Sequence, residues 1–261
     1  MTDVDVRLED GILWATLNRP QVLNAVRGQT LREVSEVLER AAREDAVRCV
    51  VLTGSGRAFS AGQDLAELEH TLGSGDETQW RAGLADFQRI TKLMLGLPKP
   101  IVAALNGAAT GFGAELALAC DVRIASVSAR IGFVEARRAL FQTNGVMWLL
   151  PRIIGHGAAM RMVLTGELLD GAEAARIGLV SEVVGNDQLL DRAAEIARAI
   201  ADNAPLSVRR AKSLLLRSWD MPLADVMAEE VEGMLESLRS EDLVEGTRAF
   251  LEKRPPEYRG C

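Results

Sequence analysis

Strand and helix signals alternate along most of this 261-residue chain, and their order restricts the fold. Alternating apolar residues over Val4–Leu17, interrupted by Asp10-Gly11, predict a β-hairpin. Apolar residues recur at helical spacing over Gln29–Arg43, which predicts an amphipathic helix. Further strands are expected at Cys49–Leu52, Ile101–Leu105 and Asp121–Ala125, and a helix at Ala114–Cys120. This alternation is typical of an α/β fold.

The rest of the chain divides into one expected loop and a helical tail. Gly73, Ser74 and Gly75 lie within Thr71–Thr78, which predicts a mobile loop. From Asp187 onward nearly all of the chain has a helical pattern. Its first helix is expected to bury one stripe, formed by Leu189, Leu190, Ala193, Ala194 and Ala197. We therefore expect an α/β body followed by a helical C-terminal region.

Composition excludes several classes of function. The net charge is −7 and aromatic residues make up 4% of the chain, so neither nucleic acid nor an anionic membrane is an expected partner. No apolar run is long enough to span a bilayer, and the first residues are acidic where a secretory signal is basic. The three cysteines suit reduced thiols better than a disulfide framework. We expect a cytoplasmic protein.

The scarcity of histidine narrows the chemistry further. With only His70 and His156, a multi-histidine metal centre is excluded, and the scattered cysteines make a zinc site unexpected. Both histidines are interpreted as surface or turn residues. Since a Ser-His-Asp hydrolase needs a histidine base, any chemistry is expected to come from carboxylates and backbone groups.

Two glycine-rich turns, Ala58–Leu65 and Asn106–Glu115, each follow a strand and open a helix. The first amides of a helix lack internal partners and carry the positive end of its dipole. Two such ends that face one another form an oxyanion hole. Neither turn matches a P-loop or dinucleotide fingerprint, and the segment around Ser60 has alanine where a nucleophile elbow has its first glycine. The alternative is that the glycines only make tight turns.

Four segments contain motif-like residues, in order, over nearly the whole chain: Leu17–Ala25, Val51–Leu65, Asn106–Asp121 and Glu245–Arg254. They resemble the signatures of the enoyl-CoA hydratase/isomerase (crotonase) superfamily. The resemblance implies a spiral of ββα turns over residues 1–200 and a helical trimerisation region over residues 201–261. It also implies a homotrimer or a dimer of trimers, and an acyl-CoA thioester as substrate. No metal and no separate cofactor is implied, because coenzyme A enters as part of the substrate.

The same resemblance assigns the site residues. The oxyanion hole would use the backbone amides of Gln63 and Phe112, and the acid–base groups would be Glu115 and Glu135. Taken alone, each glutamate is interpreted as a surface or capping acid. The resemblance assigns contacts with coenzyme A to Gln21, Val22, Ala25, Ala61, Asp64 and Leu65, and, from a neighbouring subunit, to Phe250 and Lys253.

The implied reaction is the addition of water to a 2-enoyl-CoA. Glu115 would act mainly as the base toward water and Glu135 as the proton donor to C2. A Δ3-Δ2-enoyl-CoA isomerase, which needs one carboxylate, and a non-catalytic CoA-binding paralogue are the alternatives. Compared with the family pattern, Gln21 replaces a frequent lysine, Phe112 a frequent glycine and Val134 a frequent proline. The segment Thr143-Asn144-Gly145 replaces a more glycine-rich stretch that shapes the acyl pocket.

Overall fold

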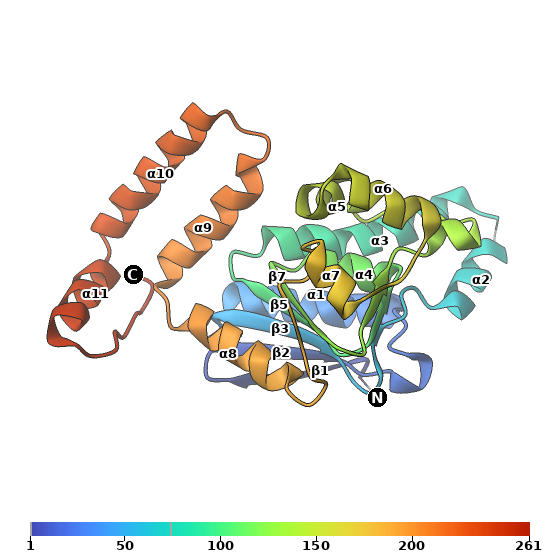
Figure 1. The fold of residues 1–261 in the computed structure, drawn as a ribbon, viewed down its shortest axis with the longest axis horizontal. Helices are drawn as coiled ribbons and strands as arrows, with labels where there is room; N and C mark the ends of the chain where they lie inside the picture. Colours follow the sequence, from blue (N-terminus) through green and yellow to red (C-terminus); the bar gives the residue numbers. More distant parts are fainter. Residues whose placement is uncertain (1, 74) are drawn as a thin grey trace.

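A sheet of mostly parallel strands forms the centre of the molecule (Figure 1). The computed structural model describes residues 2–73 and 75–261, and the side chains of these residues except 70–72. The first sheet has the order β1-β2-β3-β5-β7-β10. These strands are β1 Val4–Glu9, β2 Ile12–Leu17, β3 Cys49–Gly54, β5 Ile101–Leu105, β7 Val122–Ser126 and β10 Glu182–Val184. Among the described strands of this sheet only β1 and β2 pair antiparallel. The predicted hairpin is confirmed, with both Asp10 and Gly11 at positive φ.

A second sheet of short strands has the order β4-β6-β8-β9. Its strands are β4 Ala58–Ser60, β6 Ala108–Thr110, β8 Arg130–Gly132 and β9 Leu169–Asp170. The consecutive pairs β3–β4, β5–β6 and β7–β8 each place one strand in each sheet, which is the repeating unit of a ββα spiral. The predicted fold class is therefore confirmed. The second glycine-rich turn is not wholly irregular as expected, because residues 108–110 form β6 beside β4 and β8.

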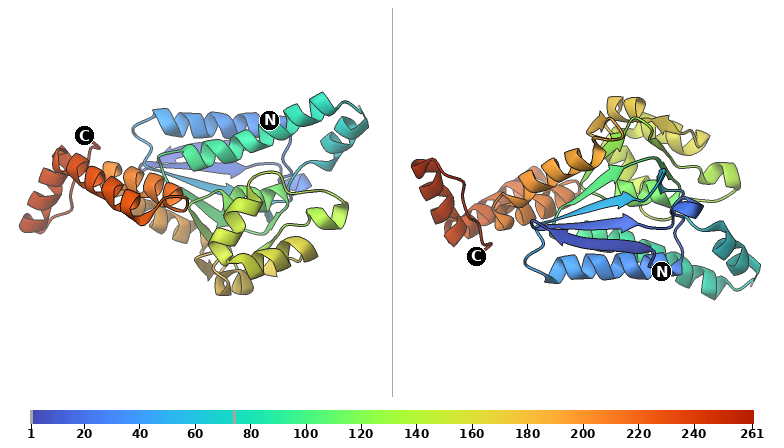
Figure 2. Two further views of the ribbon diagram at one scale, coloured as in Figure 1. Left: turned by 90° about the horizontal axis from the view of Figure 1, so that it is seen from above. Right: turned by 90° about the horizontal axis from the view of Figure 1, so that it is seen from below.

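Helices cover both faces of the first sheet (Figure 2). They are α1 Gly28–Arg43, α2 Leu65–Gly73, α3 Glu77–Gly96, α4 Phe112–Leu118, α5 Val146–Ile154, α6 His156–Thr165, α7 Gly171–Arg176, α8 Leu189–Ala201, α9 Pro205–Ser218, α10 Leu223–Leu238 and α11 Glu241–Glu252, with 3-10 segments η1 Pro20–Val22 and η2 Glu135–Arg138. Because side chains alternate along a strand, Val50 and Leu52 pack toward α1 and α3, whereas Cys49 and Val51 pack toward α8.

Three local predictions require correction. The expected loop over Thr71–Thr78 is mostly helical, because α2 continues to Gly73 and α3 begins at Glu77. The Asp76 carboxylate caps α3 by accepting a hydrogen bond from the Thr78 amide at 2.9 Å. Ser74, in the middle of that expected loop, lies outside the described residues. The helix expected at 114–120 begins two residues earlier, at Phe112. On α8, Leu190 is 47% exposed rather than part of the buried stripe.

Helices α9, α10 and α11 extend away from the sheets (Figure 1). An ion pair between buried Lys212 and half-buried Asp121 joins α9 to the body: Lys212 Nζ lies 2.7 Å from Asp121 Oδ2 and also donates to the Lys99 carbonyl at 3.1 Å. Along α10 one stripe of apolar side chains is exposed: Leu223, Met227, Val231, Met234 and Leu238. No helix in the described part of the chain is long and apolar enough to cross a membrane.

Candidate active site

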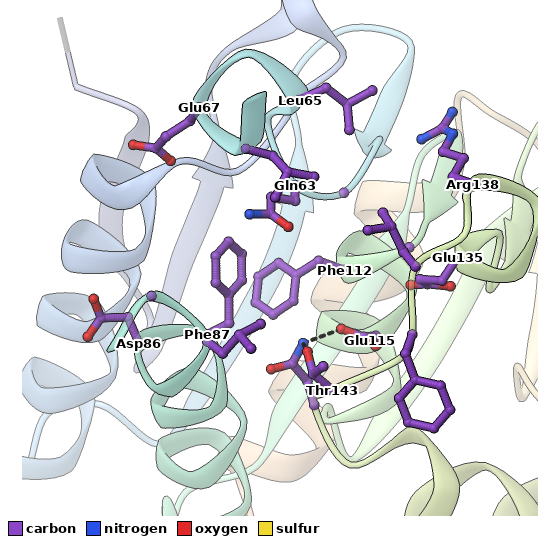
Figure 3. A pocket seen from close by; sticks show the side chains of 18 of the residues that line it. Gln63, Leu65, Glu67, Asp86, Phe87, Phe112, Glu115, Glu135, Arg138 and Thr143 are labelled. Carbon is purple, nitrogen blue, oxygen red and sulfur yellow. Dashed lines mark hydrogen bonds between the residues drawn. The ribbon is translucent and has the colours of Figure 1, made fainter. Parts of the chain in front are cut away.

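A cavity of about 550 Å³ lies between α2, α3, α4 and η2 (Figure 3). Aromatic rings form part of its wall: Phe87 of α3 and Phe112 of α4 pack edge to face, with ring centroids 4.6 Å apart. Gln63, Glu115 and Glu135 line the same cavity. A mostly apolar cavity with a few converging polar groups is typical of a small-molecule site.

The two glycine-rich turns touch one another at this cavity. Gly62 has φ +95, and a Cβ atom at this position would lie 2.7 Å from the Thr110 carbonyl oxygen and 3.1 Å from the Phe112 amide nitrogen. Only glycine permits both the backbone angle and this approach. The Thr110 hydroxyl also donates to the Ala61 carbonyl at 3.1 Å, so the turns are joined directly.

Each turn presents one unpaired backbone amide. The first turn is fixed on both sides of Gln63, because Val26 N donates to Gly62 O at 2.8 Å and Asp64 N donates to Val26 O at 2.8 Å. Within the described part of the chain, neither the Gln63 amide nor the Phe112 amide has an acceptor. Phe112 is the first residue of α4, so its amide also lies at the positive end of the helix dipole. The pair suits an oxygen that gains negative charge.

Glu115 lies in the first turn of α4 and is buried, with 2% of its surface exposed. Its Oε2 accepts a hydrogen bond from Asn144 Nδ2, drawn as a dashed line in Figure 3. Among the described residues Oε1 has no partner. Burial raises the pKa of Glu115 to about 7, and the nearby charge of Glu135 adds to the rise. The hydrogen bond from the Asn144 side chain opposes the rise most, and the backbone amides of Thr143 and Asn144 also oppose it.

Glu135 begins η2 and faces the cavity from the other side. It is 9% exposed, and Gln142 Nε2 donates to its Oε2 at 3.2 Å. Its Oε1 would lie 3.4 Å from a Cβ atom at Gly111, so this carboxylate is next to the second glycine turn. Burial raises the pKa of Glu135, while its own backbone amide, Gln142 and the charge of Arg138 oppose the rise.

The coenzyme A contacts predicted within a single chain fall into three groups. Ala61 and Leu65 line the cavity. The Asp64 carboxylate is instead held by Arg19 Nη1 at 2.8 Å, which lowers its pKa. The other contacts predicted within this chain, Gln21, Val22 and Ala25, lie in or beside η1, outside the cavity lining.

The structure does not bring Phe250 and Lys253 to the cavity of the same chain. They lie at the end of α11, far from α2 and α4 (Figure 1), and Phe250 is 83% exposed. Their predicted contact with a neighbouring subunit's ligand stays a prediction.

Sequence reasoning missed the two carboxamides that hold the glutamates, Gln142 and Asn144. The segment 143–145 was predicted to shape the pocket, but nothing in one sequence pairs Asn144 with a side chain 29 positions away. Gln88 of α3 fixes this segment by donating to the Thr143 carbonyl at 2.9 Å. A run of two carboxamides around one threonine at a predicted pocket was the available signal.

Other chemistries find less support. The Ser60 hydroxyl is buried and donates to the Asn24 carbonyl at 2.8 Å, so it is engaged in structure rather than aimed at the cavity. His156 is exposed at the start of α6, whereas the His70 side chain lies outside the described residues. Among described residues there is no group of three or more His, Cys, Asp or Glu side chains that would hold a metal ion.

Two unpaired amides facing two buried carboxylates define a class of enzyme site. Amides in such a site can stabilise a carbonyl oxygen that gains negative charge, and carboxylates can transfer protons at the neighbouring carbons. Such a site serves reactions that pass through the enolate of a carbonyl compound.

Comparison with known proteins agrees with this class. The family model for enoyl-CoA hydratase/isomerase matches residues 7–260. The chain is 39% identical to an (E)-benzylidenesuccinyl-CoA hydratase of Thauera aromatica, covering 99% of both chains, and 34% identical to a 1,2-epoxyphenylacetyl-CoA isomerase of Escherichia coli, covering 97% of both. The crystal structure of an enoyl-CoA hydratase from Bacillus anthracis matches with a TM-score of 0.95 at 35% identity, over 99% of this chain and 100% of that one. The chain belongs to the enoyl-CoA hydratase/isomerase family, which acts on acyl-CoA thioesters.

Proposed function

We propose that this protein is an enoyl-CoA hydratase, which adds water across the C2=C3 bond of a 2-enoyl-CoA to give a 3-hydroxyacyl-CoA. The observation that carries the proposal is the pairing of Glu115 with Glu135 in one cavity, beside the free amides of Gln63 and Phe112. An isomerase needs only one carboxylate, whereas hydration uses two.

The amides prepare the substrate. The thioester oxygen accepts hydrogen bonds from the Gln63 and Phe112 amides, which draws electron density from C3 through the conjugated double bond. Loss of one such donor costs about 3–4 kcal/mol in other enzymes. Because the Phe112 amide lies at the N-terminus of α4, the positive end of the helix dipole adds to this stabilisation.

The glutamates then move the protons. Glu115 takes a proton from water as the water oxygen bonds to C3, and Glu135 gives a proton to C2 as the enolate collapses. The pair is reset when a proton passes from Glu115 to Glu135. Burial raises the pKa of Glu115 to about 7 and also raises the pKa of Glu135, so both carboxyl groups can exchange protons near neutral pH. The assignment of base and donor within the pair follows the family resemblance. The reaction as written needs no metal and no separate cofactor.

The C-terminal helices are the proposed assembly region. The exposed stripe of α10 and the exposed Phe250 support a homotrimer or a dimer of trimers built through residues 201–261. In such an assembly Phe250 and Lys253 would reach the coenzyme A of a neighbouring subunit. Sedimentation analysis of the purified protein measures the oligomer, and a monodisperse monomer would contradict this proposal. We also propose that the protein is cytoplasmic.

A Δ3-Δ2-enoyl-CoA isomerase is the second candidate, because the matching family model covers both hydratases and isomerases. A 2-enoyl-CoA and a 3-enoyl-CoA are supplied in parallel to wild-type protein, and the acyl products are identified by mass and retention. A hydratase converts the 2-enoyl ester into its 3-hydroxy product. Conversion of the 3-enoyl ester alone, with no hydration, would refute the proposal in favour of the isomerase. Binding of both esters without turnover would indicate a non-catalytic paralogue.

A further inference from the structure

One short segment supplies a hydrogen-bond donor to each catalytic glutamate. Gln142 Nε2 donates to Glu135, and Asn144 Nδ2 donates to Glu115. All four side chains are buried. This segment, between η2 and α5, is fixed from outside by the hydrogen bond from Gln88 of α3 to the Thr143 carbonyl. The two donors are therefore delivered by one anchored piece of backbone.

The unpartnered atoms in this region are concentrated on one pair. Among the described residues, the buried side-chain polar atoms that lack a partner are Thr91 Oγ1, Glu115 Oε1 and Asn144 Oδ1. Buried polar atoms without partners are rare and costly, so those that persist call for an explanation. Two of the three belong to the Asn144–Glu115 pair, and both residues line the cavity.

The geometry divides the two oxygens of Glu115. The terminal torsion of a glutamate is broad, so a carboxylate with no partner presents either oxygen to a ligand. Here Asn144 holds Oε2, which leaves Oε1 as the oxygen able to accept a proton from water. Donation to Oε2 also favours the charged carboxylate, against the effect of burial.

We propose that Asn144 is a positioning residue for Glu115, which fixes one carboxylate oxygen and presents the other to the attacking water. This inference rests on the proposed hydration function, within which it assigns Asn144 a role that Gln142 does not share. Gln142 serves Glu135, the proton donor to C2. The two carboxamides therefore act on different steps of proton transfer.

The test compares two variants of matched shape. Asn144→Leu and Gln142→Met each remove a carboxamide while nearly keeping the size of the side chain. Both are compared with wild-type protein for kcat and KM with a short 2-enoyl-CoA across the neutral pH range. The carboxyl titration of Glu115 is followed separately by carbon-13 NMR of glutamate-labelled protein, and its signal is assigned from its loss in Glu115→Gln.

Asn144→Leu is expected to move the Glu115 titration, and the acid limb of kcat, to higher pH by about one unit. At neutral pH we expect kcat to fall about tenfold or more, with KM within about twofold of wild type, because the pair acts on the attacking water and not on the thioester. Gln142→Met is expected to leave the Glu115 titration in place. General damage to the cavity would instead raise KM in both variants.

The proposal is overturned if Glu115 titrates in Asn144→Leu as it does in wild type, or if Gln142→Met moves it equally. Thermal unfolding verifies that each variant folds, and Asn144→Ala, which removes the same donor with less steric demand, replaces Asn144→Leu if that variant does not. Absence of hydration in wild-type protein would refute the proposed function, while the NMR titration would still decide the pairing of Asn144 with Glu115.

Discussion

A methyl group on residue 62 is expected to separate the two halves of the oxyanion hole. In Gly62→Ala the new Cβ would lie 2.7 Å from the Thr110 carbonyl oxygen and 3.1 Å from the Phe112 amide nitrogen. Both atoms belong to backbone, which cannot swing aside as a flexible side chain does. Alanine is also strained at φ +95. The second turn must therefore retreat by several tenths of an ångström, and the Phe112 amide moves with it.

The expected loss of turnover depends on how far a functional group can move from its productive position. A functional group must stay within about 0.5 Å of its productive position, and a 1 Å misplacement costs on the order of 100-fold in rate. For a retreat of several tenths of an ångström we expect kcat of Gly62→Ala to fall about 10- to 100-fold, equivalent to about 1.4–2.7 kcal/mol. The free energy of unfolding should drop by about 1–3 kcal/mol from backbone strain.

The assay is turnover of a short 2-enoyl-CoA, with thermal unfolding measured on the same samples. Gly96→Ala is the matched control: it makes the same chemical change near the end of α3, where a Cβ atom meets nothing within 4 Å. Its turnover is expected to match wild type. A folded Gly62→Ala that keeps kcat within threefold of wild type would refute the reasoning about the two turns.

Three further outcomes concern the buried Glu115, the Lys212–Asp121 ion pair and the exposed stripe of α10. The pKa of Glu115 is raised in the folded state, so the contribution of this group to stability is fully present below the ordinary pKa of 4.5 and is lost as the pH rises toward about 7. Chemical denaturation should therefore show that wild type loses about 3 kcal/mol of stability relative to Glu115→Gln over that interval. A flat difference between the two proteins would contradict the burial of this charge. Lys212→Met leaves the half-buried Asp121 carboxylate with the Ile101 amide but without its cation, so denaturation should show a loss of about 1–3 kcal/mol, and an unchanged stability would count against this ion pair. Charged replacement of Met227 and Val231 on the exposed stripe of α10 should reduce the sedimentation coefficient if this stripe forms the subunit interface, and an unchanged oligomer would exclude it.

Elements set by local patterns were predictable from the sequence. The hairpin at Asp10-Gly11 and the buried strands around Val51 and Val102 require only turn chemistry and apolar runs, and both patterns are local. The family resemblance assigned amides and glutamates to one site, and the structure brings Gln63, Phe112, Glu115 and Glu135 to one cavity.

Contacts between distant residues were not predictable. Asn144 meets Glu115 because the loop before α5 folds over α4, and Lys212 reaches Asp121 across 91 positions. Neither residue type implies its partner. Glycines at 73 and 75 indicated a loop, but helix α2 continues to Gly73 and Asp76 caps α3, so composition overstated the irregular segment. Leu190 fits the apolar stripe of α8 by spacing but faces away from the sheet.

The central claim is that the protein uses two carboxylates to catalyse the addition of water to the double bond of a 2-enoyl-CoA. It is tested most directly by incubating wild-type protein with a 2-enoyl-CoA in ¹⁸O-labelled water and analysing the product by mass spectrometry. The expected product is a 3-hydroxyacyl-CoA that carries the label on C3, formed orders of magnitude more slowly by Glu115→Gln and by Glu135→Gln. Recovery of unlabelled ester, or of an ester in which only the double bond has moved, would contradict the claim.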